Sequence, residues 1–136
     1  MIQQIEIQLP EFARGAHVIT SYITSKLPLL PEKGLLHIFI KHTSAGITIN
    51  ENADPSVRHD FEVGFNQLVP SSNKEFTHTL EGPDDMPSHI KSSLVGHSLT
   101  IPITARKLNL GTWQGIYLCE FRNFADPRNL VITIYA

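Results

Sequence analysis

Histidines and carboxylates concentrate in two stretches of this 136-residue chain, 42–60 and 78–89. His42, His78 and His89 each fall at the end of a predicted element or on a helix face, beside polar residues. Three neutral imidazoles from separate elements suit a Zn²⁺-like ion that keeps a fourth position open for water or substrate. We therefore predict that the two stretches meet at one metal or phosphate site, with these three histidines as ligands.

The spacing of the histidines leaves an alternative open. No pair has a compact ligand spacing such as H-x-x-x-H, so each ring could instead hydrogen-bond the turn that it occupies. Asp85 lies four residues before His89, which places both on one helix face. A ligating imidazole commonly donates its other N–H to a carboxylate, so Asp85 is a candidate for orienting His89.

The acids support a second, overlapping hypothesis. Glu81, Asp84 and Asp85, together with Glu51, would suit Mg²⁺ bridged to a substrate phosphate, because a hard ion prefers oxygen ligands. The alternative is that Asp84 and Asp85 only cap the helix that follows. The sequence thus predicts a divalent metal and leaves the choice between zinc and magnesium open.

Donors for a phosphate or another anion are also present. Hydroxyl, cationic and amide groups come from Thr43, Ser44, Arg58, Lys91 and the segment 111–115, which includes Thr112, Trp113 and Gln114. The first-turn amides of the helix after Asp54 are further candidates, although Asp54 competes for them. Packing and edge pairing would equally explain Trp113 and Gln114.

The periodicity of apolar residues predicts the elements that must position these groups. Strands are expected at 2–9, 16–20, 34–41, 47–51, 98–103, 112–121 and 129–135. The strands 34–41 and 47–51 are expected to form a hairpin. Helices are expected from 20 to about 27, from Asp54 to near Pro70 with a stripe of Val57, Phe61, Phe65 and Leu68, and from about 85 to Gly96 with Met86, Ile90 and Leu94 buried. Interspersed helices and short connections predict a single α+β domain over 1–136, a mainly antiparallel β-sandwich with two to three helices.

Composition excludes several classes of protein. Lys and Arg number 11 against 13 Asp and Glu, so no basic excess supports nucleic-acid binding. No apolar stretch approaches the roughly 20 residues that cross a membrane, and 1–10 lacks the pattern of a signal peptide. The single cysteine, Cys119, lies in an apolar run, which favours a buried thiol and a reducing compartment. We predict a cytoplasmic protein.

Three long motifs, in the same order, resemble those of the YjbQ family, also known as secondary thiamine-phosphate synthases. They are HTSAGITINENADPSVRHDF, EGPDDMPSHIKSSLVG and SLTIPITARKLNLGTWQGIYLCEFR, and the resemblance covers nearly the whole chain from Arg14. It implies an α+β sandwich that assembles as a homotrimer, a polar cleft associated with metal, and a weak thiamine-phosphate synthase activity in some members. The resemblance also adds Asn50 and Asp60 to the site.

Two functions are therefore expected. The first is a transferase that joins hydroxymethylpyrimidine diphosphate to thiazole phosphate and releases pyrophosphate. The second is a metal-dependent hydrolase, or a small-ligand or metal-binding trimer, with another natural substrate. Both use a small phosphorylated molecule or a metal and neither uses nucleic acid or a membrane. The predicted catalytic residues are Glu51, Asp60, Glu81 and Asp85; the predicted substrate contacts are Thr43, Ser44, Asn50, Arg58, Lys91, Thr112, Trp113 and Gln114; and the predicted metal ligands are His42, His78 and His89.

Overall fold

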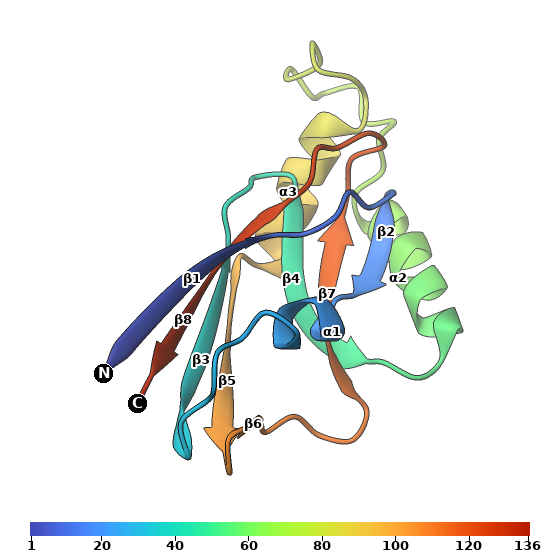
Figure 1. The fold of residues 1–136 in the computed structure, drawn as a ribbon. Coiled ribbons are helices and arrows are strands. Elements are labelled where there is room, and N and C mark those ends of the chain that lie inside the picture. The colour runs from blue at the N-terminus through green and yellow to red at the C-terminus, as the bar shows by residue number, and fades with distance from the viewer.

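Two antiparallel sheets form the framework of the protein (Figure 1). The computed structural model describes residues 1–136. The five-stranded sheet has the order β1-β8-β3-β5-β6 and the three-stranded sheet has the order β2-β7-β4. The strands are β1 (Ile2–Gln8), β2 (Gly15–Val18), β3 (Lys33–Ile40), β4 (Ala45–Glu51), β5 (Ser98–Thr104), β6 (Lys107–Leu108), β7 (Gln114–Glu120) and β8 (Asn129–Tyr135).

The hydrophobic core contains 17 buried apolar residues, most of them from the strands of the two sheets. Strand β3 shows how the sequence specifies it: Leu36, Ile38 and Ile40 are buried, whereas the alternate residues Leu35 and Phe39 are exposed on the other face. Successive side chains of a strand point to opposite faces, so this alternation fixes which face of the sheet covers the core. Cys119 is buried, as predicted, and burial and the nearby Glu62 raise the pKa of its thiol to about 12.

Three helices accompany the sheets: α1 (Thr20–Thr24), α2 (Pro55–Leu68) and α3 (Asp85–Val95). Helix α2 begins as predicted, because the Asp54 carboxylate accepts the Ser56 N–H at 2.9 Å and Pro55 takes the first helical position. Helix α3 ends as predicted at Gly96, whose φ of 108° is rare for residues with a side chain. None of the helices has the length and apolar character needed to cross a membrane.

The predicted α+β class with antiparallel sheets is confirmed, but the predicted hairpin is wrong. Strand β3 pairs with β5 and β8, whereas β4 pairs with β7 in the other sheet. The segment 41–44 thus carries the chain from one sheet to the other. The end of α3 lies where a neighbouring strand was expected, since Ile47 N–H donates to the Gly96 carbonyl and Ser92 Oγ donates to the Ala45 carbonyl.

The predicted buried face of α3 is also wrong. Leu94 is 62% exposed, and Met86 and Ile90 are only half-buried. The fully buried positions of the helix are instead mostly polar: Asp85, Pro87, Ser88, Lys91 and Ser92. Each buried polar side chain has a hydrogen-bond partner, which offsets the cost of removing it from water. The apolar spacing therefore missed a helix that is held by hydrogen bonds on its inner face.

Candidate metal centre

Three ionisable side chains converge beside the first turn of α3: His78, Asp85 and His89. Asp85 and His89 lie four residues apart, so both project from one face of the helix. His78 comes from the irregular segment that connects α2 to α3, and its ring centroid lies 5.4 Å from that of His89. One ligand atom from each of the three residues lies within 4.8 Å of the other two.

The hydrogen bonds around His89 determine which of its nitrogens is free. Nδ1 of His89 lies 2.8 Å from the Thr43 carbonyl, which can only accept, so Nδ1 carries the proton. Nε2 of the neutral ring then presents a lone pair, yet it lies 3.0 Å from Asp85 Oδ2. His78 Nε2 lies 2.6 Å from the same oxygen. Two electron-rich atoms facing each other need a proton or a cation between them, and a metal ion among the three atoms would meet that need.

Asp85 is only 1% exposed, and its other oxygen, Oδ1, accepts a hydrogen bond from Arg122 Nη1. Burial alone raises the pKa of a carboxyl group, but here hydrogen bonding to His78 and Glu81 and the charges of His89 and Arg122 lower the pKa of Asp85 to about 2. The carboxylate is therefore charged at neutral pH and has one oxygen directed at the imidazoles.

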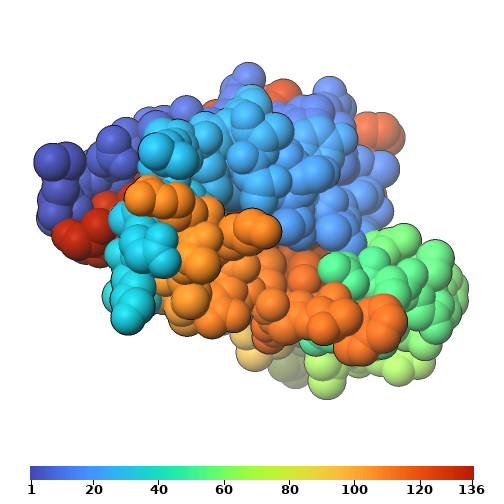
Figure 2. Space-filling model, turned by 60° about the horizontal axis from the view of Figure 1, so that its bottom comes forward, coloured from blue at the N-terminus to red at the C-terminus, as the bar shows by residue number.

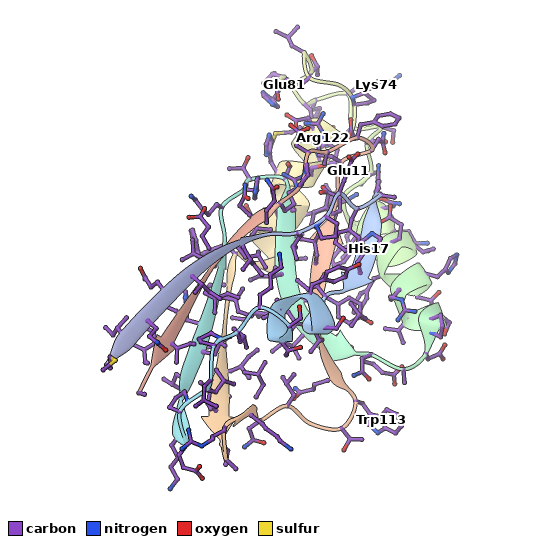
Figure 3. The ribbon with its side chains drawn as sticks, viewed as in Figure 1. Glu11, His17, Lys74, Glu81, Trp113 and Arg122 are labelled. Carbon is purple, nitrogen blue, oxygen red and sulfur yellow. The ribbon has the colours of Figure 1, made fainter.

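Arg122 organises the turn around the cluster, and Figure 3 shows it at the same end of the molecule as Glu81. It follows β7, and its Nε lies 2.9 Å from Asp84 Oδ2 while its Nη2 donates to the Glu81 carbonyl at 3.0 Å. Burial lowers the pKa of Arg122, but the hydrogen bonds and charges of Asp84 and Asp85 raise it by more than burial lowers it. The net shift of this pKa is therefore upward. Sequence reasoning missed this residue. The available signal was a lone arginine directly after the buried run 115–121.

The donor set fits zinc better than magnesium. Two imidazole nitrogens and one carboxylate oxygen form a common set for catalytic zinc, whereas Mg²⁺ requires mainly oxygen ligands. Tetrahedral zinc at about 2.0–2.2 Å from each ligand requires the donor atoms to lie closer than about 4 Å to one another. The side chain of His78 is 47% exposed and therefore has room to adjust. Glu81 Oε2, 3.9 Å from His78 Nε2, is a further carboxylate oxygen beside the cluster.

His42 does not join this cluster, contrary to the predicted three-histidine set. Its Nε2 accepts the backbone N–H of Asn129 at 2.8 Å, so the lone pair of that nitrogen is already used. Burial lowers the pKa of His42, and the charge of Arg128 lowers it further, which favours the neutral ring with its proton on Nδ1. Asp85 takes the place in the cluster that the sequence assigned to His42.

The structure places Thr43 and Ser44, two of the predicted substrate contacts, close to the cluster, but it buries a third, Lys91. Thr43 supplies the carbonyl that fixes His89, and Ser44 Oγ accepts from Arg128 Nη2 at 2.9 Å. Lys91 is 1% exposed and donates to Asn66 Oδ1 at 2.7 Å, on the inner side of α3. Its predicted contact with substrate is therefore contradicted, because the ammonium group is enclosed by protein.

The remaining predicted residues lie at the opposite end of β4 and β7. A seven-residue strand spans about 20 Å, which separates the start of β7 from its end. Figure 3 shows Trp113 at one end of the molecule and Arg122 at the other. Two hydrogen bonds hold this distant end: the Asn52 backbone N–H donates to the Trp113 carbonyl, and the Gly111 backbone N–H donates to the side-chain Oε1 of Gln114. The structure thus does not bring the following predicted site residues to the cluster: Asn50, Glu51, Arg58, Asp60, Thr112, Trp113 and Gln114.

Several cavities surround the cluster. A hollow of about 760 Å³ is lined by His42, Thr43 and His89, and one of about 210 Å³ is lined by His78. A cavity of about 440 Å³ between the 20–30 segment and residues 106–110 is more apolar, and it lies at the other end of the molecule (Figure 2). We assign no chemistry to that cavity because it contains no cluster of ionisable groups that could hold an ion.

Comparison with known proteins agrees with the fold and the motifs. The family model described as UPF0047 protein YjbQ-like matches residues 3–136. The chain is 52% identical to the UPF0047 protein YjbQ of Salmonella typhimurium over 136 residues, which covers 98% of each chain. Its structure is similar to that of an uncharacterised YjbQ/UPF0047 protein from Clostridium acetobutylicum, with a TM-score of 0.80, 38% identity and coverage of 96% and 98%. It is also similar to that of a conserved hypothetical protein from Thermus thermophilus, with a TM-score of 0.83, 30% identity and coverage of 94% and 97%. The chain therefore belongs to the YjbQ (UPF0047) family.

Proposed function

We propose that this protein is a zinc-dependent enzyme that hydrolyses a small phosphorylated molecule, with the ion held by His78, Asp85 and His89. The observation that supports this function best is the approach of two imidazole Nε2 atoms to one carboxylate oxygen, at 2.6 and 3.0 Å. A site with three protein ligands leaves a position for water or substrate, which is the arrangement found in hydrolytic zinc enzymes.

When bound, zinc would supply Lewis-acid chemistry, polarising a phosphoryl oxygen and making water a stronger nucleophile at neutral pH. The chain's own residues have three tasks. The Thr43 carbonyl keeps the His89 proton on Nδ1, so that Nε2 stays available. Arg122 holds Asp85 Oδ1, so that Oδ2 faces the imidazoles. Glu81 has an exposed side chain close to His78 and is the residue we assign to accept the proton of the attacking water.

The second candidate is the thiamine-phosphate synthase reaction that the family resemblance implies. A cation at the cluster would offset the charge of the departing pyrophosphate. The ligand set argues against a magnesium-based version, because Asp84 is bound to Arg122 and Glu51 lies at the opposite end of β4, which leaves Glu81 as the free carboxylate. The homotrimer remains a prediction, which sedimentation velocity would test.

Zinc binding is the first test. We expect the purified protein to retain about one zinc per chain after dialysis, measured by elemental analysis, and His78→Ala and His89→Ala to bind zinc at least about tenfold more weakly. His59→Ala is the matched control, because that ring is exposed on α2 and bonded only to Asp60. Equal zinc content in the cluster variants and the control would refute the proposed site.

Activity is the second test. Release of phosphate from a panel of small phosphate esters, and formation of thiamine phosphate from its two precursors, should be measured with and without zinc. We expect zinc-dependent phosphate release that His89→Ala and Glu81→Gln reduce and His59→Ala does not. Thiamine phosphate formation without ester hydrolysis would favour the second candidate, and neither activity in the zinc-loaded protein would contradict both.

A further inference from the structure

We propose that the cavity between residues 42–44 and 122–128 is an anion subsite that binds a second phosphate group of the substrate, one that is not hydrolysed at the cluster. This inference rests on the proposed function, since it names the part of the substrate that lies beside the cluster. The cavity has a volume of about 270 Å³ and is lined by His42, Ser44, Arg122, Phe124, Ala125, Asp126 and Arg128. Whole-ligand pockets measure about 300–1,000 Å³, so this space suits one group of a ligand.

Arg122 places the cavity next to the metal centre. Arg122, whose guanidinium group bonds Asp84 and Asp85, also lines this cavity. His42 lines both this cavity and the 760 Å³ hollow that His89 lines. A substrate whose reacting phosphoryl group lies at the cluster can therefore extend a second phosphate group past Arg122 into the cavity.

Arg128 is the central donor of the cavity. Its side chain is only 9% exposed and is fixed by hydrogen bonds from Nε to Glu120 at 2.7 Å and from Nη2 to Glu120 at 2.6 Å and Ser44 Oγ at 2.9 Å. These hydrogen bonds use Nε and Nη2 and leave Nη1 without a partner. Every fully buried side-chain nitrogen in this structure has a hydrogen-bond partner, so Nη1 must reach solvent. Because Arg128 lines this cavity, we infer that the two N–H groups of its Nη1 are available to donate to a ligand there.

Two further donors belong to the same wall. Ser44 Oγ accepts from Arg128 and keeps its own O–H free to donate. His42 uses Nε2 as an acceptor for Asn129 N–H, so its remaining ring group is the Nδ1 donor. Donors from three side chains on two segments suit a tetrahedral oxyanion better than a planar carboxylate, which one arginine can bind alone.

The charges around the cavity favour recognition by directed donors. The Glu120 carboxylate neutralises the charge of Arg128, and Asp84 and Asp85 neutralise the charge of Arg122. Asp126 is the one acidic side chain in the lining, and it is exposed. Removing its charge should therefore strengthen phosphate binding without disturbing the fold.

Inorganic phosphate is the probe, titrated into the full-length protein and followed by NMR of the backbone and of the His and Arg side-chain nitrogens. We expect saturable shifts at His42, Ser44 and Arg128, with a Kd on the order of 1 mM. Asp126→Asn should tighten binding by at least about threefold, because a unit charge a few ångströms away is removed. Asp60→Asn is the matched control, since it removes an exposed negative charge from α2, and it should leave the Kd unchanged. Ser44→Ala should weaken binding several-fold.

Three results would overturn the subsite: no shifts at these residues in excess phosphate, equal tightening by Asp60→Asn, or equal shifts with acetate at the same concentration. Zinc content measured on the same samples separates the two proposals. Zinc retained without phosphate binding would overturn the subsite alone. Phosphate binding in a protein that does not bind zinc would overturn the proposed function alone.

Discussion

The two ends of β4 and β7 carry similar residue types but use them differently. At the α3 end, carboxylates and imidazoles bond to one another, and Asp84 and Asp85 are buried. At the other end the side chains of His59 and Asp60 are about three-quarters exposed, and Asn50 bonds to the neighbouring Glu51 N–H. The difference is the presence of α3 and Arg122, which remove one set of groups from water. Polar density in a sequence thus becomes a candidate site only where a second element encloses it.

The largest expected difference between the two ends concerns a single aspartate at each. Asp85→Asn leaves Arg122 without one of its carboxylate partners and removes the buried negative charge that faces two imidazoles, so the free energy of unfolding should fall by about 3 kcal/mol. Asp60→Asn should change it by less than about 0.5 kcal/mol, because that side chain is exposed. Urea unfolding measures both. A similar small loss in both variants would mean that the buried cluster adds little to stability.

Acid should reveal the same contrast. The pKa of Asp85 is about 2 in the folded protein, against about 3.9 in an unfolded chain. A depressed pKa contributes stability that is present above about pH 4 and is lost as the pH falls toward 2. The wild-type protein should therefore lose about 2 kcal/mol more than Asp85→Asn over that interval. Urea unfolding at pH 6, 4 and 2.5 would measure this loss of stability. An equal loss of unfolding free energy in the wild type and Asp85→Asn would contradict the pKa shift.

The features that could be predicted correctly from the sequence are those that residues close together in the chain determine. The Asp54-Pro55 start of α2, the Gly96 end of α3 and the alternation in β3 each depend on neighbours in the chain. The contact between Asp85 and His89 could be predicted for the same reason, because residues four apart lie on one face of a helix.

What the sequence could not show depends on long-range contacts. The use of His42 Nε2 depends on Asn129, 87 residues away, and the role of Arg122 depends on residues 37 and 38 positions earlier. Strand β6 was missed because Ala105 and Arg106 form its turn at positive φ, 51° and 64°, without the glycine or asparagine that usually marks one.

Lys91 tests whether buried polar groups at the α3 end all contribute in the same way. Burial lowers the pKa of Lys91, and the charge of Arg14 lowers it further, since both cations donate to Asn66 Oδ1. Lys91→Met fills a similar volume without a buried charge, so we expect unfolding free energy to rise by about 1 kcal/mol with zinc binding unchanged. Urea unfolding and zinc titration measure the two effects. A loss of stability would show that the ammonium group is better solvated than its burial indicates.

The smallest expected effect belongs to Trp113, the only tryptophan of the chain, which is 64% exposed at the end opposite to the cluster. About 20 Å of strand separates it from Arg122, so zinc bound within one chain should leave its fluorescence unchanged. Trp113→Ala should alter neither zinc affinity nor, beyond about 0.5 kcal/mol, stability. A fluorescence titration with zinc, with the His89→Ala variant as the blank, tests this directly. Quenching that depends on His89 and grows with protein concentration would mean that an associated copy places its Trp113 beside the cluster, so that the two ends would form one site across an interface.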